Sequence, residues 1–329
     1  MPEWKRIAIG SGAAMFVCMG LGRFSYTTMV PLLIWDGQLT PVATGYIGGF
    51  NLAATLAGAF VANFLTNFCG QKPVLTASLW MGVLALIASS LPAGGYWLGF
   101  WRSVIGFSTG IIMVQSLTLT VNSAPTLQRA LAASFVFIGV GSGILFSALI
   151  VPVLSVSGTQ NAWIGIAVAG LALAVLAQWG WRHVPADTSR SGKIRKLSLN
   201  NMTRSLSVLI VASFCFSFGI VPHTIFWVDF IARYLDYGQN VGSIHWLFVG
   251  VFAIAGPVAA ARLAEWVGSV KALSLMLLLT GIGIGLPAFT TTLPILAVST
   301  VLFGSQPGVS ALLAATLRDL SEADFVPEL

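Results

Sequence analysis

The stretch from Ile7 to Ile34 reads IAIGSGAAMFVCMGLGRFSYTTMVPLLI and contains a single charged residue, Arg23. About 20 consecutive apolar residues are enough to cross the roughly 30 Å hydrocarbon core of a bilayer as an α-helix. The apolar core of a secretory signal peptide is only about 7–15 residues long, so this stretch is too long to be one. It therefore predicts a transmembrane helix that is retained in the protein.

Apolar runs of about this length recur along the chain between short turns. The sequence is 57% hydrophobic and 8% charged, whereas soluble domains have about 25% charged residues. Because so few charges cannot coat a water-facing surface, we expect an all-α polytopic membrane protein. The ten predicted spans cover residues 7–34, 41–67, 73–91, 96–121, 130–154, 161–181, 205–233, 241–262, 271–289 and 292–317.

The basic residues predict the orientation of these spans. If the N-terminus is cytoplasmic, 13 of the 16 Lys and Arg residues fall on the cytoplasmic side, as the positive-inside rule requires. The same placement argues against a nucleic-acid partner in spite of the net charge of +6, because such a partner needs basic residues gathered on one solvated face. The lipid bilayer is the partner that we expect.

The motifs of several other function classes do not occur. The three cysteines are an odd number without metal-ligand spacing, so neither a disulfide framework nor a metal site is predicted. The predicted loops contain no nucleophile with a base and no phosphate-binding loop, and most are too short to build such a site. We therefore predict that the protein is not an enzyme and uses no cofactor.

The chain contains an internal repeat. A shift of 198 residues places Gly58 on Gly256 and Gly70 on Gly268, and it also aligns Gly106 with Gly304 and Gly110 with Gly308. Duplicated helical bundles are a recurring design of secondary transporters. The predicted domains are an N-terminal six-helix bundle (1–181), a basic cytoplasmic linker (182–204) and a C-terminal bundle of four spans (205–329).

The same shift predicts that the second half is incomplete. The last residue, Leu329, aligns with the start of the fifth predicted span, so the fifth and sixth spans have no repeat counterpart. We expect a chain truncated after its tenth span.

Two predicted turns resemble the cytoplasmic-loop signature of the major facilitator superfamily, which in outline reads Gly-x-Leu-Ala-Asp-Arg-x-Gly-Arg-Arg. The second copy, ARLAEWVGSVK at 261–271, keeps the acid, the glycine and basic residues. The first copy keeps the glycine and the lysine but has Asn67 in place of the acid. The resemblance implies a latch that stabilises one conformation, made by Gly70, Lys72, Arg262, Glu265, Gly268 and Lys271.

Further motifs narrow the resemblance. The fourth predicted span contains Arg102 followed by Gly106 and Gly110, which is similar to the fourth-span motif of the superfamily. The sequence also resembles the YbfB/YjiJ-type branch of the superfamily in two segments, LGRFSY at 21–26 and FWVD at 226–229. This resemblance implies a carrier of the bacterial inner membrane with the major facilitator fold. The branch does not imply a particular substrate.

Charged residues inside a membrane are costly and by default indicate a function, so Arg23 and Arg102 are the first candidates for a solute site. Tyr26 and Thr27 share the helical face of Arg23 because they follow it by three and four residues. An anion-accepting cavity follows as a hypothesis. The alternative is that each arginine binds backbone carbonyls or reaches the membrane surface and only holds helices together.

The second half supplies further candidates. His223 follows a proline in the seventh span and is the best candidate for proton coupling, with Thr224 beside it. A hydrogen-bonded packing histidine is the alternative. Asp229 is a second proton-coupling candidate, although a structural ion pair with Arg233 is the favoured explanation. Gln306, at a predicted kink of the tenth span, is the remaining solute-site candidate.

These observations predict a secondary active transporter of a small organic solute that is coupled to protons and works by alternating access between two bundles. Two alternatives remain open. One is a non-transporting membrane receptor or assembly protein on the same fold. The other is an inactive, truncated remnant of a transporter.

Overall fold

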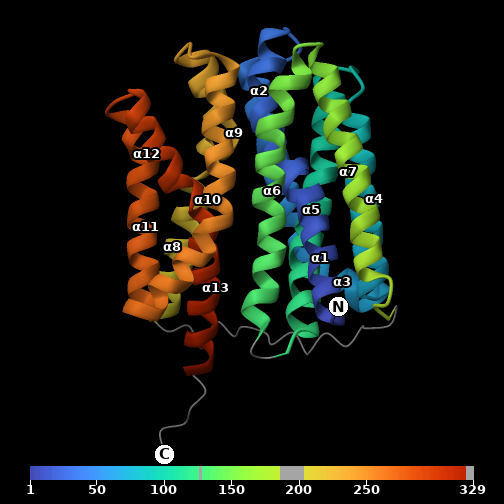
Figure 1. The fold of residues 1–329 in the computed structure, drawn as a ribbon, viewed down its shortest axis with the longest axis vertical. Coiled ribbons are helices and arrows are strands. Elements are labelled where there is room, and N and C mark those ends of the chain that lie inside the picture. The colour runs from blue at the N-terminus through green and yellow to red at the C-terminus, as the bar shows by residue number, and fades with distance from the viewer. Residues whose placement is uncertain (126–127, 186–203, 324–329) are drawn as a thin grey trace, which may run out of the picture. The chain divides into compact units, whose positions relative to one another are not determined.

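A computed structural model describes residues 1–125, 128–185 and 204–323. These residues form helices and turns without a β-strand, and ten helices among them are long and apolar enough to cross a membrane (Figure 1). The predicted all-α, ten-span architecture is confirmed, with ends that differ by a few residues. The spans are Glu3–Trp35, Pro41–Cys69, Gln71–Ser89, Gly95–Ser123, Leu131–Ser155, Thr159–Trp181, Arg204–Tyr234, Gly238–Val267, Ser269–Ala288 and Leu293–Leu313.

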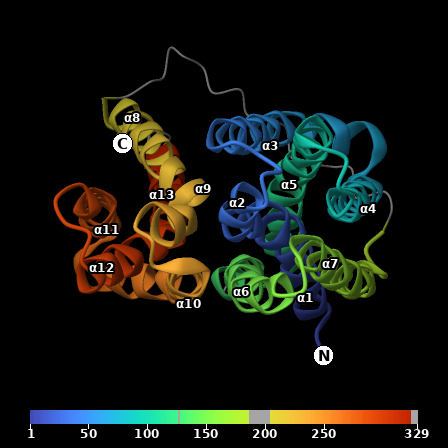
Figure 2. The same cartoon turned by 90° about the horizontal axis from the view of Figure 1, so that it is seen from above.

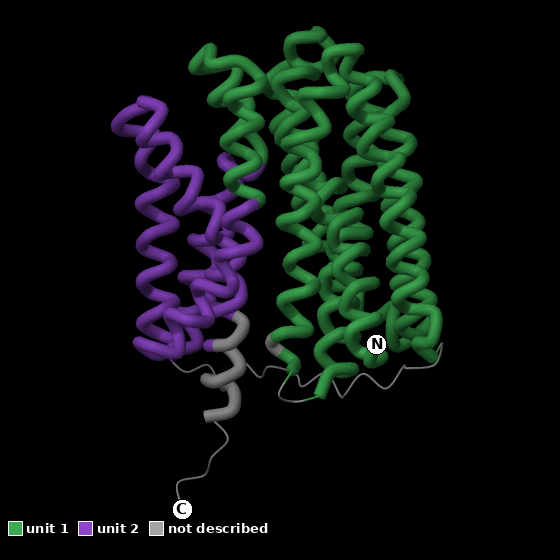
Figure 3. The backbone as a smooth tube through the Cα atoms, viewed as in Figure 1, with its two compact units in different colours: residues 1–192, 225–250 green, residues 193–224, 251–329 purple. Residues whose placement is uncertain are grey.

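The chain divides into two compact units (Figure 3). Unit 1 comprises Met1–Gly192 and Ile225–Gly250, and unit 2 comprises Lys193–Thr224 and Val251–Leu329. The division falls inside two helices, α9 (Val221–Asp229) and α10 (Gly238–Val267). Each of these helices therefore contributes residues to both units. Most of the predicted linker, residues 186–203, lies outside the described part of the chain.

The first span is interrupted by an unusual helical segment. It consists of α1 (Glu3–Met15), a π-helix η1 (Phe16–Phe24) and α2 (Ser25–Trp35). A π-helix is wider than an α-helix and is rare, and it occurs frequently at functional sites. Arg23 lies at the end of η1, directly before the α2 turn that carries Tyr26.

The other helices of unit 1 pack through small residues. These helices are α3 (Pro41–Cys69), α4 (Gln71–Ser89), α5 (Gly95–Ser123), α6 (Arg129–Ser155) and α7 (Thr159–Trp181). Helix α5 contacts both α3 and α4, and α1 contacts both α6 and α7 (Figure 2). A Cβ atom on Gly20 would lie 2.7 Å from the Cα atom of Gly143. Glycines at such places allow the helix backbones to approach closely.

Unit 2 is built from α8 (Arg204–Gly219), residues 251–267 of α10, α11 (Ser269–Gly285), α12 (Leu293–Gly304) and α13 (Gln306–Ala323). Its apolar core contains Leu209, Leu273, Met276 and Leu312. The seventh span breaks at Ile220, between α8 and α9, and the tenth breaks at Ser305, between α12 and α13. Both breaks lie beside the candidate residues that the sequence analysis selected.

The predicted repeat is visible in the backbone. Gly70 and Gly268, which are 198 residues apart, have φ/ψ angles of 88°/155° and 86°/153°. Only glycine adopts such a conformation readily, because it has no Cβ atom. Each of the two glycines ends one span and begins the next. The tight turns of the signature motif are therefore equivalent in the two halves.

Candidate functional site

Arg102 lies in the interior of unit 1, where it is 1% exposed. Its Nη2 donates a hydrogen bond to the carbonyl oxygen of Arg23 at 3.3 Å. The guanidinium carbon lies 4.9 Å from the centre of the Tyr26 ring and 5.8 Å from that of Trp163 on α7. Aromatic faces attract cations at such distances. The structure therefore brings Arg102, Tyr26 and the Arg23 backbone together, as the sequence analysis expected, and adds Trp163.

Arg23 differs from Arg102 in its exposure. It is only partly buried, and its guanidinium carbon lies 5.3 Å from the centre of the Phe24 ring. The next turn of the span is anchored to α3, because the Tyr26 hydroxyl donates a hydrogen bond to the carbonyl oxygen of Thr44 at 3.1 Å. Thr27 is buried on the same segment. Of the two arginines, Arg23 is the more exposed.

Neither arginine has an acidic partner among the described residues. The ion pairs found there join Arg6 to Glu3 and Arg233 to Asp229. The sequence contains no Asp or Glu between Asp36 and Asp187, so spans two to six cannot supply one. A buried charge without a counterion is strongly unfavourable. Within the described residues, the protein itself therefore supplies no counterion for either arginine.

Three candidates from the second half, His223, Thr224 and Gln306, lie in unit 2, whereas Asp229 lies in unit 1. His223 is 9% exposed, and its ring centre lies 5.2 Å from that of Phe303 on α12. Thr224 is buried, and its hydroxyl donates a hydrogen bond to the carbonyl oxygen of Val221 at 2.8 Å. Gln306 is half-buried at the first position of α13. Within unit 2, His223 thus packs against the span that carries Gln306.

The pairing of Asp229 with Arg233 is confirmed. Arg233 Nε and Nη2 donate to the two carboxylate oxygens of Asp229 at 2.9 Å and 3.0 Å. The Asp229 side chain is 7% exposed and the Arg233 side chain is 30% exposed. A two-point contact of this kind is among the stronger ion pairs in proteins. Asp229 is therefore occupied in this conformation, and it would have to leave Arg233 before it could carry a proton.

Sequence reasoning missed a set of contacts between Ile225–Gly250 and the rest of unit 1. The Gln239 side chain donates a hydrogen bond to the carbonyl oxygen of Thr28 at 2.9 Å. The Phe24 and Trp246 rings lie 6.1 Å apart, and a Cβ atom on Gly48 would lie 2.8 Å from Ile225 Cδ1. These contacts join the first and second spans to the seventh and eighth. Hydrophobicity alone could not predict them, because they depend on how each helix is rotated about its axis.

The latch residues are distributed over two turns. Lys72 Nζ donates a hydrogen bond to the carbonyl oxygen of Arg182 at 2.9 Å. In the second copy, Arg262, Glu265 and Lys271 are exposed and form no ion pair with one another within the described residues. The geometry of both glycine turns is thus retained, whereas an ionic latch is not formed in unit 2 in this conformation.

A network of side-chain amides, which was not predicted from the sequence either, lies beside the turn at Gly70. Gln71 Nε2 donates to Gln115 Oε1 at 3.2 Å, and Gln115 Nε2 donates to Asn63 Oδ1 at 2.9 Å. The network connects α3, α4 and α5 beside the turn that has lost its acid. The shift of 198 residues places Ala261, Ser269 and Leu313 at the equivalent positions of the second half. The presence of three amides in the first half only was the sequence signal that could have predicted this network.

The chain matches the family described as "Uncharacterised MFS-type transporter YbfB" over residues 15–324. It belongs to the major facilitator superfamily. The resemblance inferred from the sequence motifs is confirmed, and the protein is a multi-pass membrane protein of a transporter family rather than an enzyme.

Relatives within the superfamily have varied descriptions. A "Putative metabolite transport protein" of Haemophilus influenzae is 26% identical over 290 residues, which cover 80% of this chain and 68% of that protein. The shikimate transporter of Escherichia coli is 28% identical over 54% of this chain and 41% of its own length. An inorganic phosphate transporter of rice (Oryza sativa) is 32% identical over 44% of this chain and 28% of its own length.

Solved structures of the superfamily share the fold. A D-xylose-proton symporter has a TM-score of 0.64 at 14% identity, covering 97% of this chain and 87% of the symporter. The nucleoside transporter NupG has a TM-score of 0.67 at 10% identity, covering 97% of this chain and 84% of that one. At these identities the similarity establishes the fold alone.

Proposed function

We propose that the protein is a secondary active transporter of a small organic anion. The observation that carries this proposal is the pair of arginines in unit 1 that have no acidic partner among the described residues. A charge retained inside a membrane at this cost usually marks a solute or ion path. The names of two relatives, a shikimate transporter and a phosphate transporter, support an anionic solute.

Arg23 is the residue that meets the solute in this proposal. It is partly exposed, and its carbonyl oxygen is fixed by Arg102. Arg102 is then a positioning residue, because its side chain is almost fully enclosed. Its role is to hold the end of the π-helix η1 in the conformation that presents Arg23.

The proposed mechanism is alternating access between two helix bundles. We assign the contacts made by Gln239, Trp246 and Ile225 to a seal that closes the solute path at one end. On the predicted orientation, in which the N-terminus is cytoplasmic and the membrane is the bacterial inner membrane, this seal lies at the outer end. His223 and Asp229 are the candidates for proton coupling, because ionisable side chains inside membrane spans commonly form proton relays.

Counterflow in proteoliposomes tests the proposal. Vesicles loaded with an unlabelled solute are diluted into a trace of the same labelled solute, with shikimate, phosphate and a neutral sugar compared. A transporter accumulates label transiently, whereas a receptor binds the label without accumulation. Accumulation of organic anions only is the expected result. Binding without counterflow, or accumulation of the sugar only, would contradict it.

A further inference from the structure

The guanidinium group of Arg102 is incompletely satisfied. Its Nη2 reaches the Arg23 carbonyl oxygen, but Nε and Nη1 are buried without a hydrogen-bond partner among the described residues. The groups on its two sides are aromatic rings, those of Tyr26 and Trp163. Aromatic rings attract the cation but cannot neutralise its charge or accept strong hydrogen bonds from it. These two nitrogens are therefore open to a water molecule or to a ligand that accepts hydrogen bonds.

The acidic residues of unit 1 do not meet this requirement. Asp229 is paired with Arg233, Glu3 with Arg6, and Asp36 accepts a hydrogen bond from Gln38 at 3.3 Å. Asp236 forms no ion pair with Arg102. Within the described residues, no acidic side chain is thus paired with Arg102.

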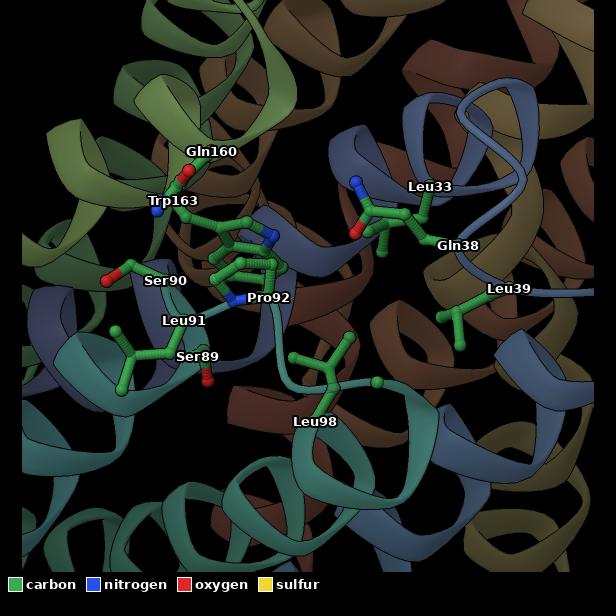
Figure 4. A pocket seen from close by; sticks show the side chains of 11 residues that line it. Leu33, Gln38, Leu39, Ser89, Ser90, Leu91, Pro92, Leu98, Gln160 and Trp163 are labelled. Atoms are coloured by element: carbon green, nitrogen blue, oxygen red, sulfur yellow. The ribbon is translucent and has the colours of Figure 1, made fainter.

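A small pocket lies next to Arg102, separated from it by one side chain. Trp163, whose ring contacts the Arg102 guanidinium, also forms part of the pocket wall, as does Leu98, one helical turn before Arg102 on α5. The polar residues Gln38, Gln160 and Ser90 also line the pocket (Figure 4). In Figure 4 the Trp163 ring lies beside Pro92, across the pocket from Gln38. No acidic residue lines the pocket.

The size of the pocket limits what can enter. Its cavity volume is about 40 Å³, and about 10–15 Å³ of such volume is enough to hold one water molecule. A monatomic anion fits such a volume, but an organic solute does not.

We propose that Arg102 binds a small inorganic anion of the size of chloride, which reaches it from this pocket past Trp163. The anion accepts hydrogen bonds from Arg102 Nε and Nη1, the two nitrogens that the protein leaves without partners. This site is distinct from the solute site, which uses Arg23. Its physical consequence is that anion binding stabilises the folded protein, because a ligand that binds only the native state shifts the unfolding equilibrium.

Thermal unfolding of the purified full chain in detergent, without any transported solute, tests this proposal. The midpoint is measured in sodium chloride and in sodium gluconate of equal concentration, because gluconate is too large for the pocket. We expect chloride to raise the midpoint saturably by about 2 °C or more, with bromide acting similarly. Equal midpoints in the two salts would overturn the proposal.

Two variants locate the effect. Arg102→Gln should lose the chloride-dependent shift, whereas Arg23→Gln, which removes the same charge from a neighbouring residue, should keep it. A chloride-dependent shift that persists in Arg102→Gln would place the anion elsewhere.

If Arg102→Gln does not fold, crystals of the unaltered protein grown in bromide provide the test. Anomalous density within hydrogen-bond distance of Arg102 Nε or Nη1 supports the site, and the absence of such density refutes it. None of these results depends on whether the protein transports a solute.

Discussion

The carbonyl oxygen of Phe107 on α5 occupies the place that a Cβ atom on Gly58 of α3 would take. The same relationship recurs 198 residues later in each helix, where a Cβ atom on Gly256 would lie 2.8 Å from the carbonyl oxygen of Ser305. Two helix pairs therefore approach at equivalent positions in the two halves. In both, the approach depends on the absence of a side chain.

Substitution of these glycines should destabilise the protein in a defined order. Gly58→Ala forces the α3 and α5 backbones apart, which we expect to cost about 1–3 kcal/mol, whereas Gly256→Ala meets a wider gap and should cost less. The control is Gly49→Ala, on the same helix as Gly58, because no atom lies within 4 Å of its added Cβ. Fluorescence-detected thermal unfolding in detergent measures the order. Equal midpoints for Gly58→Ala and Gly49→Ala would refute the packing role.

The two arginines should affect transport differently. Arg23→Gln removes the charge that we assign to the solute, so the solute concentration at half-maximal uptake should rise about 10- to 100-fold, corresponding to a charged hydrogen bond of about 1.5–3 kcal/mol. Arg102→Ala should abolish uptake while the amount of protein in the membrane stays within about twofold. Uptake of a labelled anion and quantitative immunoblotting measure both. A parallel loss of protein and uptake in Arg102→Ala would instead favour a packing role.

The proposed seal can be tested by cross-linking. Gln239 contacts the backbone of Thr28, so cysteines at these two positions should react together with a short bifunctional thiol reagent. If the seal has to open during transport, cross-linking should stop uptake and each single cysteine should leave it unaffected by the reagent. A chain that is fully cross-linked yet transports at the normal rate would contradict this role.

The predicted orientation can be tested through the exposed thiol of Cys69 at the end of α3, in a chain with Cys215→Ser because the Cys215 thiol is exposed as well. A membrane-impermeant maleimide should label Cys69 in inverted vesicles but not in intact spheroplasts, because the predicted N-terminus is cytoplasmic. The control places a cysteine at Tyr96, which is fully exposed at the opposite end of the unit, in a chain with Cys69→Ser and Cys215→Ser. That cysteine should label only in spheroplasts, and the reverse pattern for the two sites would invert the orientation.

The Asp229–Arg233 pair should act as a structural link. Asp229→Asn and Arg233→Gln should each lower the unfolding midpoint, and the double variant should lose less than the sum of the two. The pH dependence of uptake should not change in either single variant. Loss of proton-driven uptake in Asp229→Asn with counterflow retained would show that Asp229 carries the proton.

The sequence predicted the spans well because membrane crossing depends mainly on the length of apolar runs, which can be read directly. It also predicted the repeat and both helix breaks, since glycine and proline act on the local backbone. It predicted the Asp229–Arg233 pair because i,i+4 residues share one helical face. These features all depend on residues close together in the sequence or on a fixed shift.

The contacts of the candidate site could not be predicted in this way. The enclosure of Arg102 by Trp163 and the bond from Gln239 to Thr28 join residues on different spans. Such contacts depend on how far each helix is rotated about its own axis, and helices that are apolar on most faces carry little sequence information about rotation. The difference in exposure between Arg23 and Arg102 was hidden for the same reason.

The equivalent turns at Gly70 and Gly268 also record how the two halves diverged after duplication. A position where only glycine fits the backbone tolerates almost no replacement, so it retains its identity for a long time. The amides at Asn63, Gln71 and Gln115 have no amide counterpart 198 residues later, because hydrogen bonds can be rebuilt from other side chains. In this protein the common ancestry of the halves is therefore preserved mainly in its glycines, while the polar groups around them have been free to specialise.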